Sequence, residues 1–165
     1  MAKNQRPVVS IIPVRNIGTD IQILLQRRSK ESDDTPYDGY LELPQGKVKA
    51  GENLTDAAQR ELQEESGLRI ERFIVGAEHS VVTDEAASDL FSFNPLICVF
   101  DREQNHLGIA VVVTVRGEAS ATSEAVGHEW HSIKELPFIL ANEPVFPLNR
   151  AMIAEFMKIA DSLFL

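Results

Sequence analysis

The sequence predicts an α/β fold in which a mixed β-sheet packs between helices, an α/β sandwich. Short apolar runs rich in β-branched residues recur along the chain, which is typical of strands. Two other segments carry helix signals, one in the middle of the chain and one near its C-terminal end. Strands interrupted by helices indicate a sheet that is covered by helices.

The expected strands are apolar runs bounded by turn residues. The first two are VVSIIPVR (residues 8–15) and IQILLQRR (residues 21–28), with the turn-like NIGTD between them. A polar loop from Ser29 to Tyr40 precedes a short strand, LELP. The later strand candidates are RIERFIVGAEHSVVT, LICVF, IAVVVTVRG and EWHSI.

Two helices are expected. Asn53 is a good N-cap residue, and Asp56 stands three positions later, in the spacing of a capping box. Gly67 suits a left-handed C-terminal cap, so this helix should run over about residues 54–66. The second helix should begin near Pro147, because proline is favoured in a first helical turn.

Composition limits the class of protein. The 165 residues fit a single domain over 1–165, and the net charge of −9 argues against nucleic acid as a partner. The single cysteine, Cys98, cannot form an internal disulfide and is interpreted as a small buried side chain. No apolar segment approaches the roughly 20 residues of a membrane helix, so we expect no membrane partner and a cytoplasmic protein.

The middle helix places several carboxylates together. Glu61, Glu64 and Glu65 stand at i, i+3 and i+4 and therefore share one helical face, where like charges repel. A hard divalent cation would turn that repulsion into attraction. On spacing alone a solvated face is the more common explanation, and both interpretations stay open.

A longer pattern surrounds these glutamates. Gly46 is followed after five residues by Glu52, and seven residues later by the segment RELQEESGL, residues 60–68. This pattern resembles the Nudix box in every defined position, and the resemblance extends loosely along the chain. It implies an α/β/α sandwich with a mixed sheet and a loop-helix-loop catalytic motif.

The resemblance also implies a function. A Nudix pyrophosphohydrolase cleaves a nucleoside diphosphate linked to another moiety, with Mg²⁺ or Mn²⁺ as the cofactor. The implied metal ligands are Glu61, Glu64, Glu65 and the backbone carbonyl of Gly46. Arg60 would orient a glutamate through a charge-assisted bond. Glu52 would brace the loop, and Gly51 and Gly67 would allow close backbone geometry.

A further carboxylate must take the proton of the attacking water. In this family the base lies in the box, which makes Glu64 one candidate, or on a later loop, where we choose Glu124; a solvated loop acid is the alternative for Glu124. Arg28, Lys47 and Lys49 are candidates for substrate binding. The four histidines show no convincing metal-ligand spacing, and we interpret them as structural or rim residues.

The substrate is left open between ADP-ribose-like compounds and nucleoside triphosphates. Two other functions compete: a non-catalytic nucleotide-sensing domain of the same fold, and an acidic interaction module whose glutamates are only solvated. A sensor would usually lack box glutamates, whereas all are present here. Dimerisation is common among relatives, so a homodimer is a further expectation.

Overall fold

The fold is described by a computed structural model that covers residues 6–29, 37–80, 91–103, 105–123 and 125–164. Three helices and ten strands lie in these ranges. The helices are α1 (Leu54–Ser66), α2 (Leu136–Asn142) and α3 (Pro147–Phe164). The strands are β1 (Arg6–Ile17), β2 (Asp20–Arg28), β3 (Leu41–Glu42), β4 (Gln45–Lys47), β5 (Arg69–Val75), β6 (Glu78–Ser80), β7 (Phe91–Phe93), β8 (Ile97–Asp101), β9 (His106–Arg116) and β10 (Ala125–Ser132).

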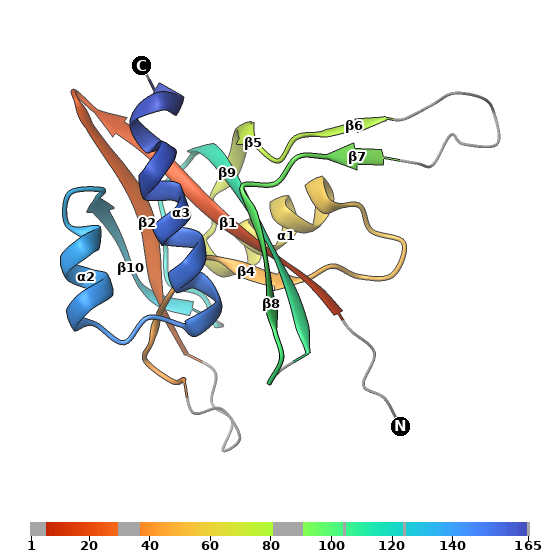
Figure 1. Cartoon of the computed structure of the whole chain (residues 1–165), viewed down its shortest axis with the longest axis horizontal. Coiled ribbons are helices and arrows are strands. Elements are labelled where there is room, and N and C mark those ends of the chain that lie inside the picture. Colours follow the sequence, from red (N-terminus) through yellow and green to blue (C-terminus); the bar gives the residue numbers. More distant parts are fainter. Residues whose placement is uncertain (1–5, 30–36, 81–90, 104, 124, 165) are drawn as a thin grey trace.

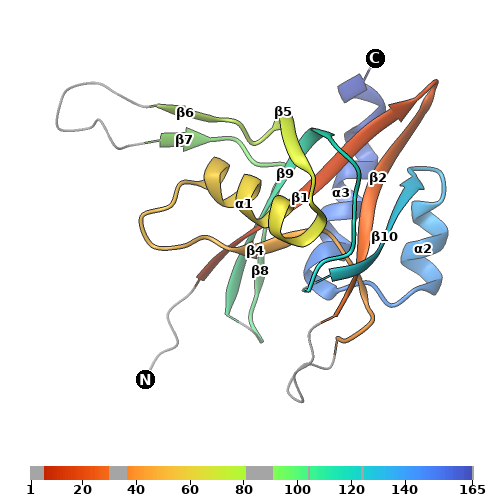
Figure 2. The same ribbon diagram turned by 180° about the vertical axis from the view of Figure 1, so that it is seen from behind.

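One mixed sheet holds the described fold together. Its main path runs β10-β2-β1-β9-β5, and β3, β4 and β8 extend β2, β1 and β9 respectively. The long central strands β1 and β9 are parallel, and their register aligns Val9 with Ile109, whereas the other pairings are antiparallel. The two strands β6 and β7 form a separate ribbon that projects beside α1 (Figures 1 and 2).

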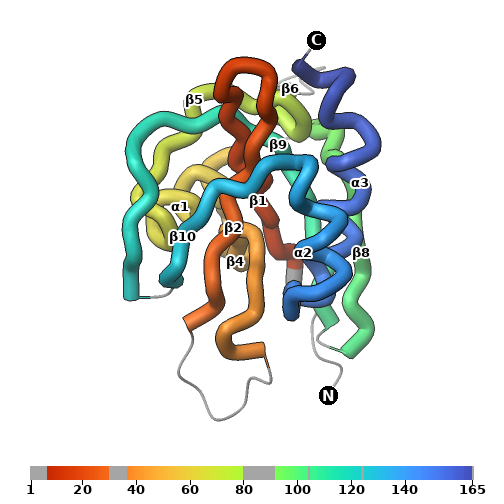
Figure 3. The backbone as a smooth tube through the Cα atoms, turned by 90° about the vertical axis from the view of Figure 1, so that its left-hand side faces the viewer, coloured from red at the N-terminus to blue at the C-terminus, as the bar shows by residue number. Residues whose placement is uncertain are grey.

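Helices cover both faces of the sheet. Figure 3 shows α1 on one side of the central strands, with α2 and α3 on the other. The α3 side buries Ile12 and Phe156, and the α1 side buries Ile11 and Leu62. Neighbouring residues of β1 pack into the cores on opposite faces of the sheet because side chains alternate along a strand. The predicted α/β/α sandwich with a mixed sheet is confirmed.

Some predicted elements differ from the structure. The run RIERFIVGAEHSVVT is not one strand, because Gly76 has φ +96° and separates β5 from β6, and residues 81–83 lie outside the described residues. The LELP segment is a strand only at β3, and β4 follows it directly. Residue patterns alone predicted two helices, and α2 is a third. Cys98 is exposed, so its interpretation as a buried side chain was wrong.

None of the helices that the structure describes is long and apolar enough to cross a membrane. The strands β9 and β10 begin three and four residues before the predicted runs, at His106 and Ala125, whereas the bounds of α1 match the prediction. The turn between β1 and β2 lies at Gly18, within NIGTD, and α3 begins at Pro147. These elements position α1 and the loop before it on one face of the sheet, where the predicted site residues gather.

Candidate functional site

The helix that carries the glutamates has well-defined ends. The Asn53 side-chain oxygen accepts a hydrogen bond from the backbone N–H of Asp56 at 2.7 Å. Glu78 of β6 accepts a second bond, from the backbone N–H of Leu54, at 2.6 Å. At the other end Gly67 has φ +75° and donates its N–H to the carbonyl of Gln63. The predicted caps are confirmed, and the two added acceptors satisfy N–H groups that no helical carbonyl can reach.

Burial separates the three glutamates of α1. Glu61 and Glu65 are buried, at 8% and 1% exposure, whereas the Glu64 side chain is 49% exposed. A carboxylate is rarely buried without partners because removing its charge from water is costly. The structure therefore contradicts a purely solvated acidic face, at least for Glu61 and Glu65.

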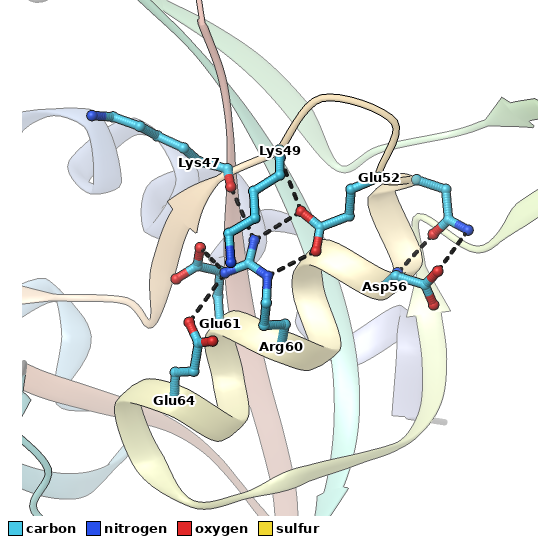
Figure 4. A network of polar contacts seen from close by, with 8 residues as sticks. Lys47, Lys49, Glu52, Asp56, Arg60, Glu61 and Glu64 are labelled. Atoms are coloured by element: carbon cyan, nitrogen blue, oxygen red, sulfur yellow. Dashed lines mark hydrogen bonds and ion pairs between the residues drawn. The ribbon is translucent and has the colours of Figure 1, made fainter.

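Arg60 joins three of the site carboxylates. Its Nε and Nη2 bind both oxygens of Glu52, at 2.7 and 2.8 Å, as a bidentate pair. Its Nη1 binds Glu61 at 2.5 Å and Glu64 at 3.1 Å (Figure 4). Nη2 also donates to the backbone carbonyl of Lys47 at 3.1 Å. One guanidinium thus offsets part of the negative charge of the helix glutamates and ties them to the preceding loop.

The contact between Arg60 and Glu52 shifts the pKa values of both groups. Hydrogen bonding from Arg60 is the main cause that lowers the pKa of Glu52 from 4.5 to about 2. The same bonds raise the pKa of Arg60 far above its ordinary value, led by the bond with Glu52. Both groups are therefore charged at every physiological pH.

Glu61 lies directly against Gly46. A Cβ added to Gly46 would stand 1.9 Å from the carboxyl carbon of Glu61 and 2.0 and 2.2 Å from its oxygens. Glycine leaves room for this carboxylate, and any side chain at position 46 would force the end of the Glu61 side chain to move. The fixed distance between Gly46 and Glu61 in the sequence thus has a steric cause.

Glu65 is held by the sheet. Its Oε2 accepts hydrogen bonds from the Gln26 side chain at 2.7 Å and from the backbone N–H of Gln45 at 2.9 Å. The Glu65 backbone carbonyl lies 2.8 Å from Nε2 of His128, and because a carbonyl only accepts, that nitrogen carries the proton. Burial lowers the pKa of His128, which keeps its ring neutral.

The predicted substrate-binding residues lie in different settings. Arg28 is 16% exposed and binds the buried Glu42 at 2.8 Å. Lys47 and Lys49 are exposed; the Lys49 backbone N–H donates to Glu52 at 2.9 Å. Gly51 has φ +77°, a conformation that favours glycine. The proposed base Glu124 lies outside the described residues.

The residues present suit a divalent cation. Within the described ranges no group of three or more His, Cys, Asp or Glu side chains forms a ready ligand set. Glu61 and Glu64 nevertheless converge on one cationic nitrogen of Arg60, so two carboxylate oxygens already share a single positive centre. Carboxylate oxygens are the ligands that Mg²⁺ and Mn²⁺ prefer, and the donor set fits these ions.

Sequence reasoning missed several polar residues around Glu65. Gln26, Glu42, Gln45 and His128 all lie in or beside strands that pack near α1. The available signal was polar residues inside apolar strand runs, such as the glutamine in LLQRR. A buried polar side chain in a strand needs a partner, and Glu65 supplies one for Gln26.

Comparison with known families decides the classification. A family profile described as NUDIX domain matches residues 4–156. The chain belongs to the NUDIX domain family. The Nudix box expected from the sequence is thus part of a match that spans most of the chain.

Solved structures share the Nudix fold. A MutT NUDIX hydrolase from Burkholderia pseudomallei has a TM-score of 0.62 at 21% identity, and the alignment covers 93% of this chain and 98% of that one. The NUDIX domain of NrtR from Shewanella oneidensis, solved with ADP ribose, has a TM-score of 0.64 at 14% identity over 96% and 90%. A possible asymmetric diadenosine tetraphosphate hydrolase from Jonesia denitrificans has 0.65 at 19% identity over 98% of each chain. At these identities the likeness establishes the fold alone.

One curated relative also matches the Nudix chain. An octanoyltransferase from Myxococcus xanthus is 36% identical over 78 residues, which are 47% of this chain. The match covers about 20% of the length of that relative. The relative is therefore a much longer protein, and its activity is not transferred to this chain.

Proposed function

We propose that this Nudix chain is a divalent-metal-dependent pyrophosphohydrolase that cleaves a phosphoanhydride bond in a nucleoside diphosphate derivative. The observation that carries the proposal is the set of box carboxylates gathered around Arg60, with Gly46 leaving space for Glu61. A protein with no use for these charges would not bury Glu61 and Glu65 at the cost that burial of a carboxylate entails.

Each residue has a role in this mechanism. Glu61, Glu64 and Glu65, with the Gly46 carbonyl, would hold Mg²⁺ or Mn²⁺, which neutralises phosphate charge and activates water. Arg60 fixes Glu61 against the loop and balances its charge. Glu64 is the most exposed of the box glutamates, so it can accept a proton from water that approaches from solvent. Glu124 is the second candidate for that base.

Substrate phosphates would be bound by the cations that border the box. Arg28 keeps its Nε without a partner in the described part of the chain, although its Nη1 binds Glu42. Lys47 and Lys49 are exposed on the loop before α1. A phosphate group offers acceptor oxygens that match these donors. ADP-ribose-like compounds and nucleoside triphosphates are the leading substrates.

The test is hydrolysis of nucleotide derivatives. ADP-ribose, sugar nucleotides, dinucleotides and nucleoside triphosphates are each incubated with Mg²⁺ or Mn²⁺, and the released phosphate species are measured. We expect hydrolysis of at least one class and its loss in Glu64→Gln, whose half-exposed position should preserve folding. Glu71→Gln, an exposed glutamate of β5, is the matched control. Equal activity of Glu64→Gln and the control would contradict the assigned role of Glu64.

The alternative is a nucleotide sensor without catalysis. This alternative is supported by the structural likeness to a NUDIX domain that was solved with ADP ribose. Tight binding of ADP-ribose or another nucleotide, with no product from any compound in the screen, would support the sensor over the hydrolase.

A further inference from the structure

A chain of hydrogen bonds between buried polar side chains crosses the core from α3 to β2. Asn149, Ser10 and Glu42 have 0% exposure, and Gln45 has 7%. Gln45 lies at the centre, because its side-chain oxygen accepts from Ser10 at 2.9 Å and from Asn149 at 2.9 Å. Its side-chain nitrogen lies 3.2 Å from Oε2 of Glu42. The same Glu42 oxygen binds Nη1 of Arg28 at 2.8 Å.

The direction of these bonds is fixed by a backbone donor. The N–H of Leu43 donates to Oδ1 of Asn149 at 3.1 Å, so the Asn149 amide must present its NH₂ group on the other side. That NH₂ group donates to Gln45, which must therefore turn its oxygen toward Asn149. The Gln45 side chain can then donate to Glu42 only through Nε2.

The backbone of Gln45 serves the box at the same time. Its N–H donates to Oε2 of Glu65, and the next residue is Gly46, against which Glu61 packs. This backbone bond does not depend on the side chain. A substitution at position 45 can therefore remove the link to Glu42 while leaving the link to Glu65 in place.

Glu42 depends on these two donors. Its Oε1 is buried without a hydrogen-bond partner in the described part of the chain, so Oε2 alone anchors the carboxylate. Loss of the Gln45 donor would leave one bond, to Arg28, on a carboxylate buried in the sheet. Such a carboxylate reorients to find other donors, because an unsatisfied buried acceptor costs free energy. Arg28 would then keep its contact with the Phe146 ring, whose centroid lies 5.2 Å from the guanidinium carbon, but would lose the ion pair that fixes its orientation.

We propose that Gln45 is a positioning residue: through Glu42 it holds the Arg28 guanidinium in place for substrate phosphates. This inference rests on the proposed function, in which Arg28 binds the substrate. It predicts that the Gln45 side chain acts on substrate binding rather than on the chemical step. It also predicts that its effect passes through Arg28 and disappears when Arg28 is absent.

The experiment is a double-mutant cycle with Gln45→Met and Arg28→Met, in which KM and kcat are measured for the best substrate of the screen. Methionine keeps the length of glutamine and removes its hydrogen bonds. We expect Gln45→Met to raise KM about fivefold, the scale of one ordinary intramolecular hydrogen bond, with kcat changed less than about twofold. In the Arg28→Met background the same change should leave KM unaltered.

Two further measurements separate positioning from general support of the fold. Gln22→Met is the matched control, since Gln22 is a half-buried glutamine of β2 that binds Arg15 and Asp20 instead. It should leave KM unchanged. The NMR signals of the Arg28 guanidinium, recorded without substrate, should show hindered rotation in the wild type and faster rotation in Gln45→Met.

The outcomes are distinct. A lower thermal midpoint in Gln45→Met with KM and the Arg28 signals unchanged would overturn the inference and leave a structural role only. Additive effects on KM in the double mutant would overturn it as well. If the Arg28 signals change as expected but no phosphoanhydride compound is hydrolysed, the proposed function fails, whereas the hold of Gln45 on Arg28 stands.

Discussion

Substitution of Gly46 by alanine tests the packing on which the site is built. The added Cβ would meet the Glu61 carboxyl group at 1.9 Å, where real Cβ contacts below 3.0 Å essentially do not occur. The carboxyl group must therefore retreat by about 1 Å, or the loop must move by a similar distance. Either movement strains the short bond between Glu61 and Arg60.

The expected costs follow from that displacement. Insertion of a methyl group into a filled volume typically lowers the free energy of unfolding by about 1–3 kcal/mol. A misplacement of about 1 Å near the reacting groups reduces the rate by roughly 100-fold. Gly46 does not have a positive φ, so backbone strain adds nothing to either value.

The assay is urea unfolding of Gly46→Ala in two backgrounds, the wild type and Glu61→Ala. The loss of about 1–3 kcal/mol should appear in the wild type and largely vanish in Glu61→Ala, where no carboxyl group meets the new methyl group. Gly51→Ala is the control. Nothing lies within 4 Å of its Cβ, but its φ of +77° costs about 1–2 kcal/mol in both backgrounds. An equal cost of Gly46→Ala in the two backgrounds would refute the steric explanation.

Three further predictions concern pH, the helix cap and the metal. Arg60 lowers the pKa of Glu52 from 4.5 to about 2, so the pair should contribute fully to the free energy of unfolding above pH 4.5 and progressively less between pH 4.5 and 2. In an acid titration, the free energy of unfolding of the wild type should therefore fall over this range, and that of Glu52→Gln should fall less. Asn53→Ala removes the cap on Asp56 and should lower that free energy by about 1 kcal/mol in urea unfolding; no change would contradict the cap. Chelation with EDTA should abolish hydrolysis, and added Mn²⁺ should restore it. Mn²⁺ should also raise the thermal midpoint of the wild type more than that of Glu61→Gln, and equal shifts would exclude Glu61 as a ligand.

The parts of the fold that depend on local chemistry could be predicted from the sequence. Asn53 and Gly67 mark the ends of α1 because capping uses backbone groups within a few residues of each. Alternation of side chains and β-branched runs likewise placed β1, β2 and β9. The spacing of the box also indicated which residues lie together in the site, since Gly46 and Glu61 are in direct contact.

The parts that depend on long-range contacts could not. Asn149 binds Gln45 across 104 positions of sequence, and nothing near either residue signals that partner. His128 was interpreted as a structural or rim residue, and its contact with the Glu65 carbonyl, which no local pattern signals, arises only when β10 pairs with β2. Burial of Glu65 also depends on the sheet, because the helical face alone does not show what covers it.

The bond from Glu78 to the first turn of α1 has a consequence for local unfolding. Glu78 belongs to the β6–β7 ribbon, which is separate from the main sheet, yet it satisfies an N–H of the helix that carries the box. Local opening of the ribbon would remove this acceptor, so the Leu54 N–H should lose exchange protection whenever the ribbon opens. Exchange protection at the start of the box helix should therefore report on opening of the β6–β7 ribbon.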